Sequence, residues 1–157
     1  MNEKMLACLS IRQPWASLIA ANIKPLENRE WPCRYQGDLA IHAGMSWDRG
    51  QEVAYQSLLQ IAIDMGDDRR IEILHRSRDL RGGIVGTCTM VGCVNADVYY
   101  ACGGKIYDGI TSWFVGPYAF AVKDAQMFRR LVPYKGQQGL FYIPWSVVAP
   151  FMENAHA

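Results

Sequence analysis

The stretch that decides the fold is Leu9-Ser-Ile-Arg-Gln-Pro-Trp-Ala-Ser-Leu-Ile-Ala20, where an apolar run passes directly into a helical pattern. Residues 5–11 have the apolar character of a buried strand. Pro14 suits the first turn of a helix, because the N–H that it lacks would be unpaired there. The helical spacing ends near Asn22, which tolerates the left-handed conformation common after a helix. We therefore expect a strand followed at once by a short helix.

A charged segment follows this helix and carries Lys24, Glu27 and Arg29 within six residues. Pro25 disfavours helical geometry in the residue before it, so the segment 24–29 is expected to be extended or turn-like. Charge concentrated beside an apolar helix is the strongest functional signal in the chain.

The rest of the chain is dominated by predicted strands. Further strands are expected at 37–43, 83–94, 117–122, 130–134 and 140–143, with glycines bending the longest one. A helix capped by Ser46 or Asp48 is expected to bury a stripe of Val53, Leu58, Leu59 and Ile61. A more exposed helix is predicted within 67–81, and a polar, glycine-rich loop at 95–109. The pattern indicates one α+β domain over residues 1–157, built on a small curved sheet or barrel.

Composition limits the classes of function. The 157 residues contain 16 basic and 15 acidic side chains, so the formal net charge is only +1. This balance argues against a protein that coats nucleic acid by bulk electrostatics, but it permits a local basic cleft. The five cysteines are scattered without a Cys-x-x-Cys pair, which disfavours a disulfide framework or structural zinc. No signal peptide or membrane span is predicted, and we expect a reducing, cytoplasmic location.

The chain resembles the ASCH family (activating signal cointegrator homology), whose fold is similar to the PUA-like β-barrel. The resemblance is carried by 9–18, by Lys24, Glu27 and Arg29 of the signature Gly-x-Lys-x-x-Glu-x-Arg, and by 37–44, 83–93 and 113–120. It is closest to the branch found in eukaryotic transcription coactivators. One departure is visible, because Asn22 occupies the position of the first glycine of the signature.

The resemblance implies binding of RNA or nucleosides in a cleft between barrel and helices. Some compact relatives resemble amidohydrolases that deacylate N4-acylated cytidine, and others have been described as ribonucleases. In the amidohydrolases the signature lysine is the base and a threonine three residues later is the nucleophile. Lys24 matches that lysine, but Glu27 occupies the threonine position. A carboxylate cannot replace an alcohol whose proton is abstracted, although it could activate a water molecule.

Lys24 and Glu27 are the candidate catalytic residues, and both are also candidate ligand contacts together with Arg29. Lys24 could act as a base if burial or a cationic neighbour lowers its pKa. It could instead be a fixed charge that holds a phosphate or stabilises an oxyanion. The structural alternative is an ion-pair network among the three side chains.

Other candidate ligand contacts surround this segment. Arg12 lies at the start of the first helix and could anchor a phosphate. Trp15 could stack on a base, although its helical spacing favours the core. His42 ends an apolar strand, where a hydrogen-bonded core histidine is the more ordinary interpretation. Ser112 and Trp113 precede a strand and could face the cleft from the opposite side.

The remaining basic residues are weaker candidates. Lys135, Arg129-Arg130 and the arginines of 67–81 could add phosphate contacts, but a solvated surface is their ordinary role. His42 has no His or Cys partner at ligand spacing, so neither a metal nor another cofactor is expected.

Three functions follow from these observations. The leading hypothesis is a module that binds nucleic acid or a modified nucleoside, most naturally RNA with DNA also possible, through phosphate capture and base stacking. The second is a hydrolase in the same cleft, an amidohydrolase on N4-acylated cytidine or a ribonuclease. The third is a coactivator-type domain that contacts protein partners only.

Overall fold

The computed structural model describes residues 3–107 and 109–152, and its centre is a six-stranded sheet in the order β2-β7-β4-β3-β1-β8. The strands of this sheet are β1 (Met5–Ile11), β2 (Leu26–Arg29), β3 (Gly37–Ala43), β4 (Gly83–Asn95), β7 (Tyr118–Pro133) and β8 (Leu140–Pro144). A separate pair consists of β5 (Lys105–Ile106) and β6 (Gly109–Ile110). The helices are α1 (Trp15–Ala20), α2 (Arg49–Met65), α3 (Asp68–Ser77), α4 (Ala96–Ala101), a 3₁₀ turn η1 (Trp145–Val147) and α5 (Ala149–Met152).

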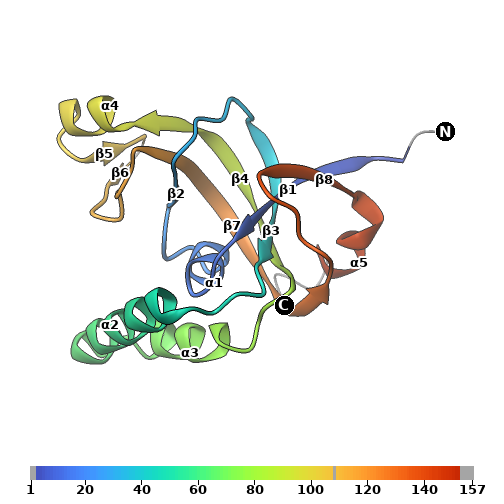
Figure 1. Cartoon of the computed structure of the whole chain (residues 1–157), viewed down its shortest axis with the longest axis horizontal. Helices are drawn as coiled ribbons and strands as arrows, with labels where there is room; N and C mark the ends of the chain where they lie inside the picture. Colours follow the sequence, from blue (N-terminus) through green and yellow to red (C-terminus); the bar gives the residue numbers. More distant parts are fainter. Residues whose placement is uncertain (1–2, 108, 153–157) are drawn as a thin grey trace.

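The sheet is strongly bent but open. Strands β1 and β3 are parallel and the other neighbours are antiparallel. The two longest strands, β4 and β7, lose register at three places along their pairing, and they curve together across the molecule (Figure 1). Within the described residues β2 and β8 are edge strands of this order. The expected α+β class is confirmed, whereas closure into a barrel stays a prediction.

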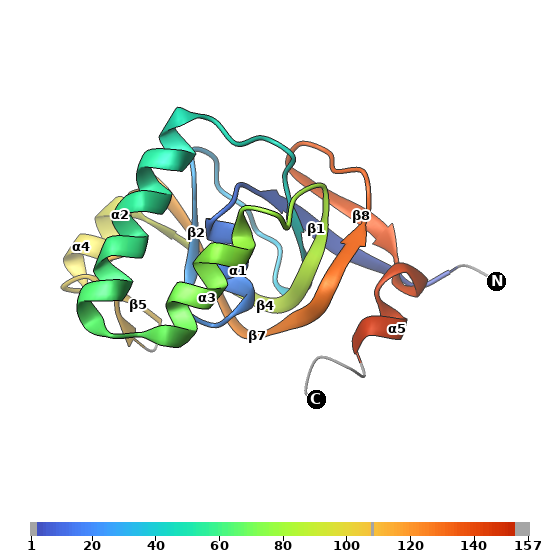
Figure 2. The same cartoon turned by 90° about the horizontal axis from the view of Figure 1, so that it is seen from below.

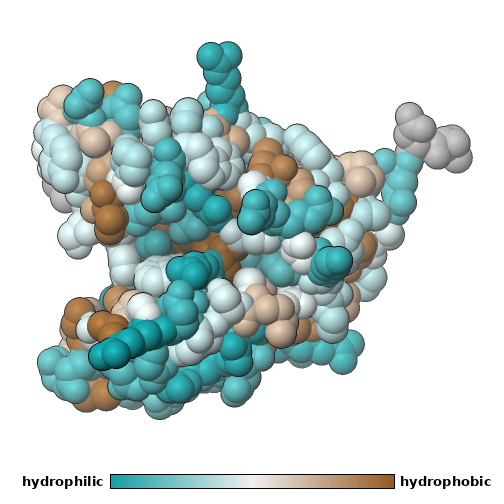
Figure 3. Space-filling model, in the orientation of Figure 1, coloured by the Kyte–Doolittle hydropathy of each residue, from teal (hydrophilic) through white to brown (hydrophobic). Residues whose placement is uncertain are grey.

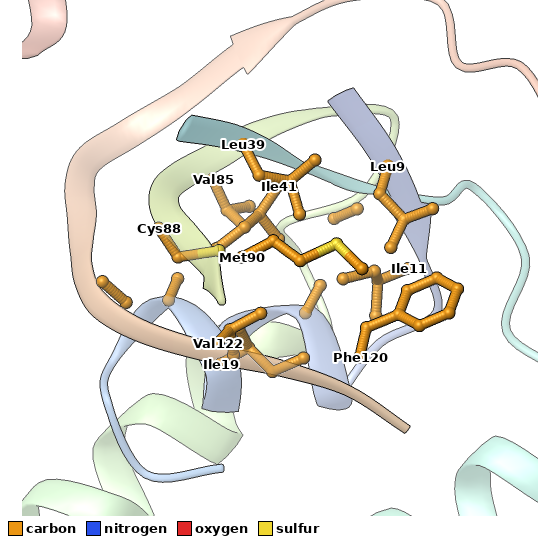
Figure 4. Packing of buried hydrophobic residues seen from close by; sticks show 14 of the residues in the cluster. Leu9, Ile11, Ile19, Leu39, Ile41, Val85, Cys88, Met90, Phe120 and Val122 are labelled. Atoms are coloured by element: carbon orange, nitrogen blue, oxygen red, sulfur yellow. The ribbon is translucent and has the colours of Figure 1, made fainter. Parts of the chain in front are cut away.

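The main core lies between the curved sheet and α1. Side chains from β1, β3, β4 and β7 point toward one another and toward Ile19 of α1 (Figure 4). The cluster includes Leu9, Ile11, Leu39, Ile41, Val85, Cys88, Met90, Phe120 and Val122. Each fully buried aliphatic or aromatic side chain stabilises the fold by roughly 1.5–3 kcal/mol. This packing holds α1 against the sheet and thereby positions the segment that follows it.

Polar contacts anchor both ends of α1. The buried amide of Gln13 accepts from the backbone N–H of Ser17 at 2.9 Å and donates to the carbonyl of Leu80 at 2.8 Å. Asn22 has a φ of 59°, which confirms its left-handed conformation. Its side-chain amide bonds both the N–H and the carbonyl of Ala125 on β7, at 2.8 and 2.6 Å. Asn22 therefore ties the start of the charged segment to the sheet.

Helices α2 and α3 form an antiparallel pair over α1 (Figure 2). Asp48 caps α2 by accepting from the N–H of Gln51, whose side chain accepts from the N–H of Asp48. The apolar face is displaced from the expected stripe: Tyr55 and Ala62 are buried, while Val53 and Ile61 are 58% and 50% exposed. The prediction for those two positions is wrong because α2 packs through one narrow face, spaced i, i+3, i+4 and i+7 from Tyr55.

Two further expectations are corrected. Part of the loop expected at 95–109 is α4, whose first turn is capped by Asn95 accepting from the N–H of Val98 at 2.9 Å. The strands expected at 117–122 and 130–134 are one strand, β7, because the polar residues between them continue the pairing with β4 despite a positive φ at Asp124.

The described cysteines are free thiols. Cys8 and Cys88 are buried in the core, and burial raises the pKa of each thiol to about 12. Among the helices of the described residues, none has both the length and the apolar character needed to span a membrane.

Candidate functional site

A cavity of about 540 Å³ opens where β1, α1 and β2 meet the segment that precedes β7. It is lined by Ser10, Arg12, Trp15, Lys24, Glu27, Asn28, Arg29, Glu30, Trp31 and Val115. The space-filling view shows the surface hollowed between the part that carries α4 and the part that carries α2 (Figure 3). The volume lies in the range typical of small-molecule sites. We refer to it as the Lys24 cavity.

The three signature residues form a linked ion pair at this cavity. Nζ of Lys24 lies 3.7 Å from Oε1 of Glu27, and a guanidinium nitrogen of Arg29 lies 3.1 Å from Oε2 of the same carboxylate. Glu27 and Arg29 are two residues apart on β2, so their side chains share one face of the strand. Lys24 reaches that face from the turn before β2. The carboxylate therefore lies between two cations.

Burial makes this arrangement electrostatically costly. Lys24 and Glu27 are only 3% and 8% exposed. Burial lowers the pKa of Lys24, with Glu27 opposing that change. Burial raises the pKa of Glu27, with Lys24 and Arg29 opposing it. When all three groups are ionised the trio carries one unbalanced positive charge, which a bound anion would neutralise.

Aromatic rings enclose the cations. Nζ of Lys24 lies 5.8 Å from the ring centre of Trp15 and 5.9 Å from that of Trp113, both within the range of a cation–π interaction. The guanidinium of Arg29 lies 5.8 Å from the ring of Trp31, which packs edge-on against Phe120. The indoles thus provide flat apolar surfaces beside the charged groups.

Hydrogen bonds to the backbone hold the charged segment in place. The N–H of Lys24 donates to the carbonyl of Leu18 in α1 at 3.1 Å. Asn28 donates to the carbonyl of Trp113 at 3.1 Å and accepts from the N–H groups of Val115 and Gly116 at 2.8 and 3.2 Å. Asn28 therefore fixes residues 113–116 against β2 and forms one wall of the cavity.

Arg29 also connects β2 to β1. Its guanidinium donates to the backbone carbonyl of Ser10. Among the described residues its buried Nε has no hydrogen-bond partner, so one donor at the cavity is unused. A ligand oxygen could accept from it, since a buried N–H without a partner is unfavourable.

Of the other predicted ligand contacts, some line the Lys24 cavity and some lie outside it. Arg12 and Trp15 line the Lys24 cavity; Arg12 is exposed and pairs with Asp48 at 2.8 Å, while Trp15 also packs against the main core. His42 is outside this cavity: it is 2% exposed and its Nε2 donates to the carbonyl of Tyr134 at 2.6 Å. Ser112 is exposed and is not among the lining residues.

Sequence reasoning missed several lining residues. Trp31 continues the two-residue spacing of Glu27 and Arg29, and that spacing could have identified it. Asn28 and Val115 carry no local signal, because their roles depend on a contact between positions 87 residues apart. Within residues 3–107 and 109–152, no cluster of three His, Cys, Asp or Glu side chains could hold a metal ion.

Comparisons with known proteins give the family and a relative of this chain. A family model described as the ASCH domain matches residues 9–124. Activating signal cointegrator 1 from Homo sapiens is 28% identical over 130 residues, which are 82% of this chain and 21% of that protein. The chain therefore spans about a fifth of the length of this curated relative.

Two solved structures from Zymomonas mobilis are similar to the chain. A mutant ZmASCH protein has a TM-score of 0.51 at 13% identity, covering 98% of this chain and 99% of that one. The ASCH protein has a TM-score of 0.49 at 13% identity, covering 90% of each chain. At this identity the mutant structure indicates a shared fold only. Because the family model matches well over half of its residues, this chain belongs to the ASCH domain family.

Proposed function

We propose that this ASCH domain binds RNA or a modified nucleoside in the Lys24 cavity. The observation that carries the proposal is the linked trio of the buried Lys24 and Glu27 with the partly buried Arg29, in which two cations share one carboxylate next to indole rings. An excess positive charge attracts a phosphate, and indole faces stack on bases. Both parts of a nucleotide therefore find a matching group in one cavity.

The charge distribution supports local rather than bulk recognition. The chain has a net charge of only +1, so it lacks a general field that would attract polyanions. The cations of the cavity act at short range and in a partly desolvated setting, where each interaction is stronger than in water. DNA and protein partners are the alternatives to RNA, the latter because the human relative is named an activating signal cointegrator.

Titration with cytidine and cytidine 5′-monophosphate (CMP), followed by tryptophan fluorescence, tests the proposal. CMP should bind more tightly than cytidine, and Lys24→Met should remove most of that difference. A charged hydrogen bond of about 1.5–3 kcal/mol corresponds to a loss of about tenfold or more in CMP affinity.

The matched control is Lys123→Met, which removes an exposed lysine from β7 outside the cavity. Its affinity for CMP should equal that of the unmodified chain. Circular dichroism checks that both variants are folded. Equal CMP affinity in folded Lys24→Met and in the unmodified chain would contradict the proposal.

A hydrolase in the same cavity is the second candidate, and it is favoured by the directions in which burial changes the pKa values of Lys24 and Glu27. Burial lowers the pKa of Lys24 and raises that of Glu27, and both changes bring the groups closer to neutral pH, where acid–base catalysis operates. Lys24 would deprotonate a water molecule or orient it, Glu27 would transfer the proton and Arg29 would stabilise the developing negative charge.

Turnover of N4-acetylcytidine, followed by the release of cytidine, tests this candidate. If the chain is an amidohydrolase, Glu27→Gln should abolish turnover while Lys123→Met retains it. Absence of turnover in the unmodified chain, together with CMP binding, would favour the binding function. Turnover that survives in Glu27→Gln would reject the assigned role of that carboxylate.

The finer features of the fold and location are part of the same proposal. We expect the chain to act as a single PUA-like domain over residues 1–157, with the curved sheet as a β-barrel flanked by helices. A reducing, cytoplasmic setting suits the buried free thiols of Cys8 and Cys88.

A further inference from the structure

A second cavity of about 580 Å³ adjoins the first at Ser10, which lines both. The other residues that line it are His42, Gly44, Met45, Gly82, Tyr134, Lys135, Gly136, Gln137 and Gln138. We refer to it as the His42 cavity. Since Ser10 is near the end of β1, the two cavities meet at that strand end. A ligand longer than one nucleotide could therefore occupy both.

The boundary between the cavities is closely packed. A Cβ atom added to Gly136 would lie 2.6 Å from Cε1 of His42 and 2.8 Å from Oγ of Ser10, so only glycine allows this approach. His42 donates from Nε2 to the carbonyl of Tyr134, and its Nδ1 lies 3.4 Å from Oγ of Ser10. These contacts hold Tyr134 and Gly136 against His42 and Ser10 and give the second cavity a defined wall.

The two cavities differ in chemistry. The Lys24 cavity offers the indoles of Trp15 and Trp31. The lining of the His42 cavity offers instead the cation of Lys135 and the amides of Gln137 and Gln138, and it includes no carboxylate. Lys135 is exposed, and within the described residues it forms no salt bridge. The first cavity suits one nucleotide, with its base beside the indoles and its phosphate at the cations, and the second suits the sugar–phosphate group of the next nucleotide.

Arg12 adds a cation at the rim of the Lys24 cavity. Its partner is Asp48, and the two side chains are 59% and 48% exposed. Exposed ion pairs contribute little to stability, so Arg12 can exchange this partner for a phosphate at little cost.

We propose that the ligand is a single-stranded RNA of at least two nucleotides, with one nucleotide in the Lys24 cavity and the sugar–phosphate group of the next passing Ser10 to Lys135 in the His42 cavity. This inference rests on the proposed function and goes beyond it, because it names an oligonucleotide rather than a free nucleoside. It also gives Lys135 a role that Lys24 does not have: Lys135 contributes only when the ligand extends past Ser10.

The experiment compares CMP with hexacytidine RNA (C6) on the unmodified chain, Lys135→Met, Lys24→Met and Lys123→Met. C6 should bind at least tenfold more tightly than CMP. Lys135→Met should reduce the affinity for C6 by about tenfold and leave the affinity for CMP unchanged. The slope of log affinity for C6 against log salt should fall by about one unit in Lys135→Met, the effect of one lost phosphate contact. Lys24→Met should weaken both ligands, and Lys123→Met should weaken neither.

The outcomes separate the two proposals. If CMP binds and responds to Lys24→Met, but C6 binds no more tightly or Lys135→Met leaves its affinity and salt slope unchanged, the extension past Ser10 is wrong and the proposed function stands. If neither CMP nor C6 binds the unmodified chain, both are wrong. A Lys135→Met variant that weakens CMP as strongly as C6 also overturns the extension, because Lys135 would then act at the first nucleotide.

Discussion

Replacing Glu27 by glutamine is the sharpest test of the electrostatics of the Lys24 cavity. The carboxylate is 8% exposed and is paired with both Lys24 and Arg29. Glutamine keeps the size of the side chain but leaves two cations beside each other without a countercharge. Removing one partner of a buried ion pair costs about 3–5 kcal/mol. We therefore expect Glu27→Gln to lower the free energy of unfolding at pH 7 by about that amount.

The loss of stability in Glu27→Gln should become smaller as the pH rises. Burial lowers the pKa of Lys24 below its ordinary value of 10.5, and Glu27 is the main group that opposes this change. Without Glu27 the pKa of Lys24 falls further, so the unfolded chain binds a proton that the folded chain does not. Stability then rises with pH between the folded-state pKa and 10.5. Within that window the free energy of unfolding of the variant should rise with pH by up to about 1.4 kcal/mol per pH unit.

Urea unfolding at pH 7, 8 and 9, followed by circular dichroism, measures both effects. The double variant Lys24→Met with Glu27→Gln is the control, because it lacks the lysine and should lose the pH-dependent recovery. Lys24→Met alone keeps the pair of Glu27 with Arg29, so it should cost less than Glu27→Gln. A Glu27→Gln loss below about 1 kcal/mol at pH 7, or a loss that does not change with pH, would refute the proposed electrostatic coupling.

Three further predictions concern hydrogen bonding at the site and burial elsewhere in the fold. Asn28→Ala removes three hydrogen bonds to residues 113–116, so it should lower the free energy of unfolding by about 1–3 kcal/mol and speed amide hydrogen exchange at Val115. Unchanged exchange at Val115 would show that Asn28 does not hold this wall of the cavity. In urea unfolding, Ile73→Ala on α3 should lower the free energy of unfolding by about 2–5 kcal/mol because Ile73 is buried, whereas Ile61→Ala on α2 should change it by less than about 0.5 kcal/mol because Ile61 is half exposed. Similar losses at the two positions would contradict the described packing face of α2. Cys102 is exposed and should react with a thiol reagent at pH 8 in the folded chain, while the buried Cys8 and Cys88, with pKa values of about 12, should react only on unfolding. Mass spectrometry measures the labelling, and a Cys8 labelled as fast as Cys102 would contradict the burial of Cys8.

Much of the secondary structure could be predicted because it depends on neighbours in sequence. The apolar run of β1, the strand 37–43 and the left-handed Asn22 are local features, and each agrees with the structure. The prediction of two strands where β7 runs without a break was wrong because the polar residues near Asp124 resemble a turn. Their pairing with β4, which overrides that preference, connects segments far apart in sequence.

By itself, the sequence determined the α+β class, the first strand and helix, and the crowding of Lys24, Glu27 and Arg29 into one short segment. Only the tertiary structure decided that the three charges are linked with Lys24 and Glu27 buried, that Trp113 lies beside Lys24 and that His42 lies in the adjoining cavity. The physical reason is that spacing along the chain specifies which face of a strand a side chain occupies, whereas burial and charge partners depend on distant segments brought together by packing. Those distant contacts lower the pKa of Lys24 and raise that of Glu27, and they turn a charged segment into a candidate binding site.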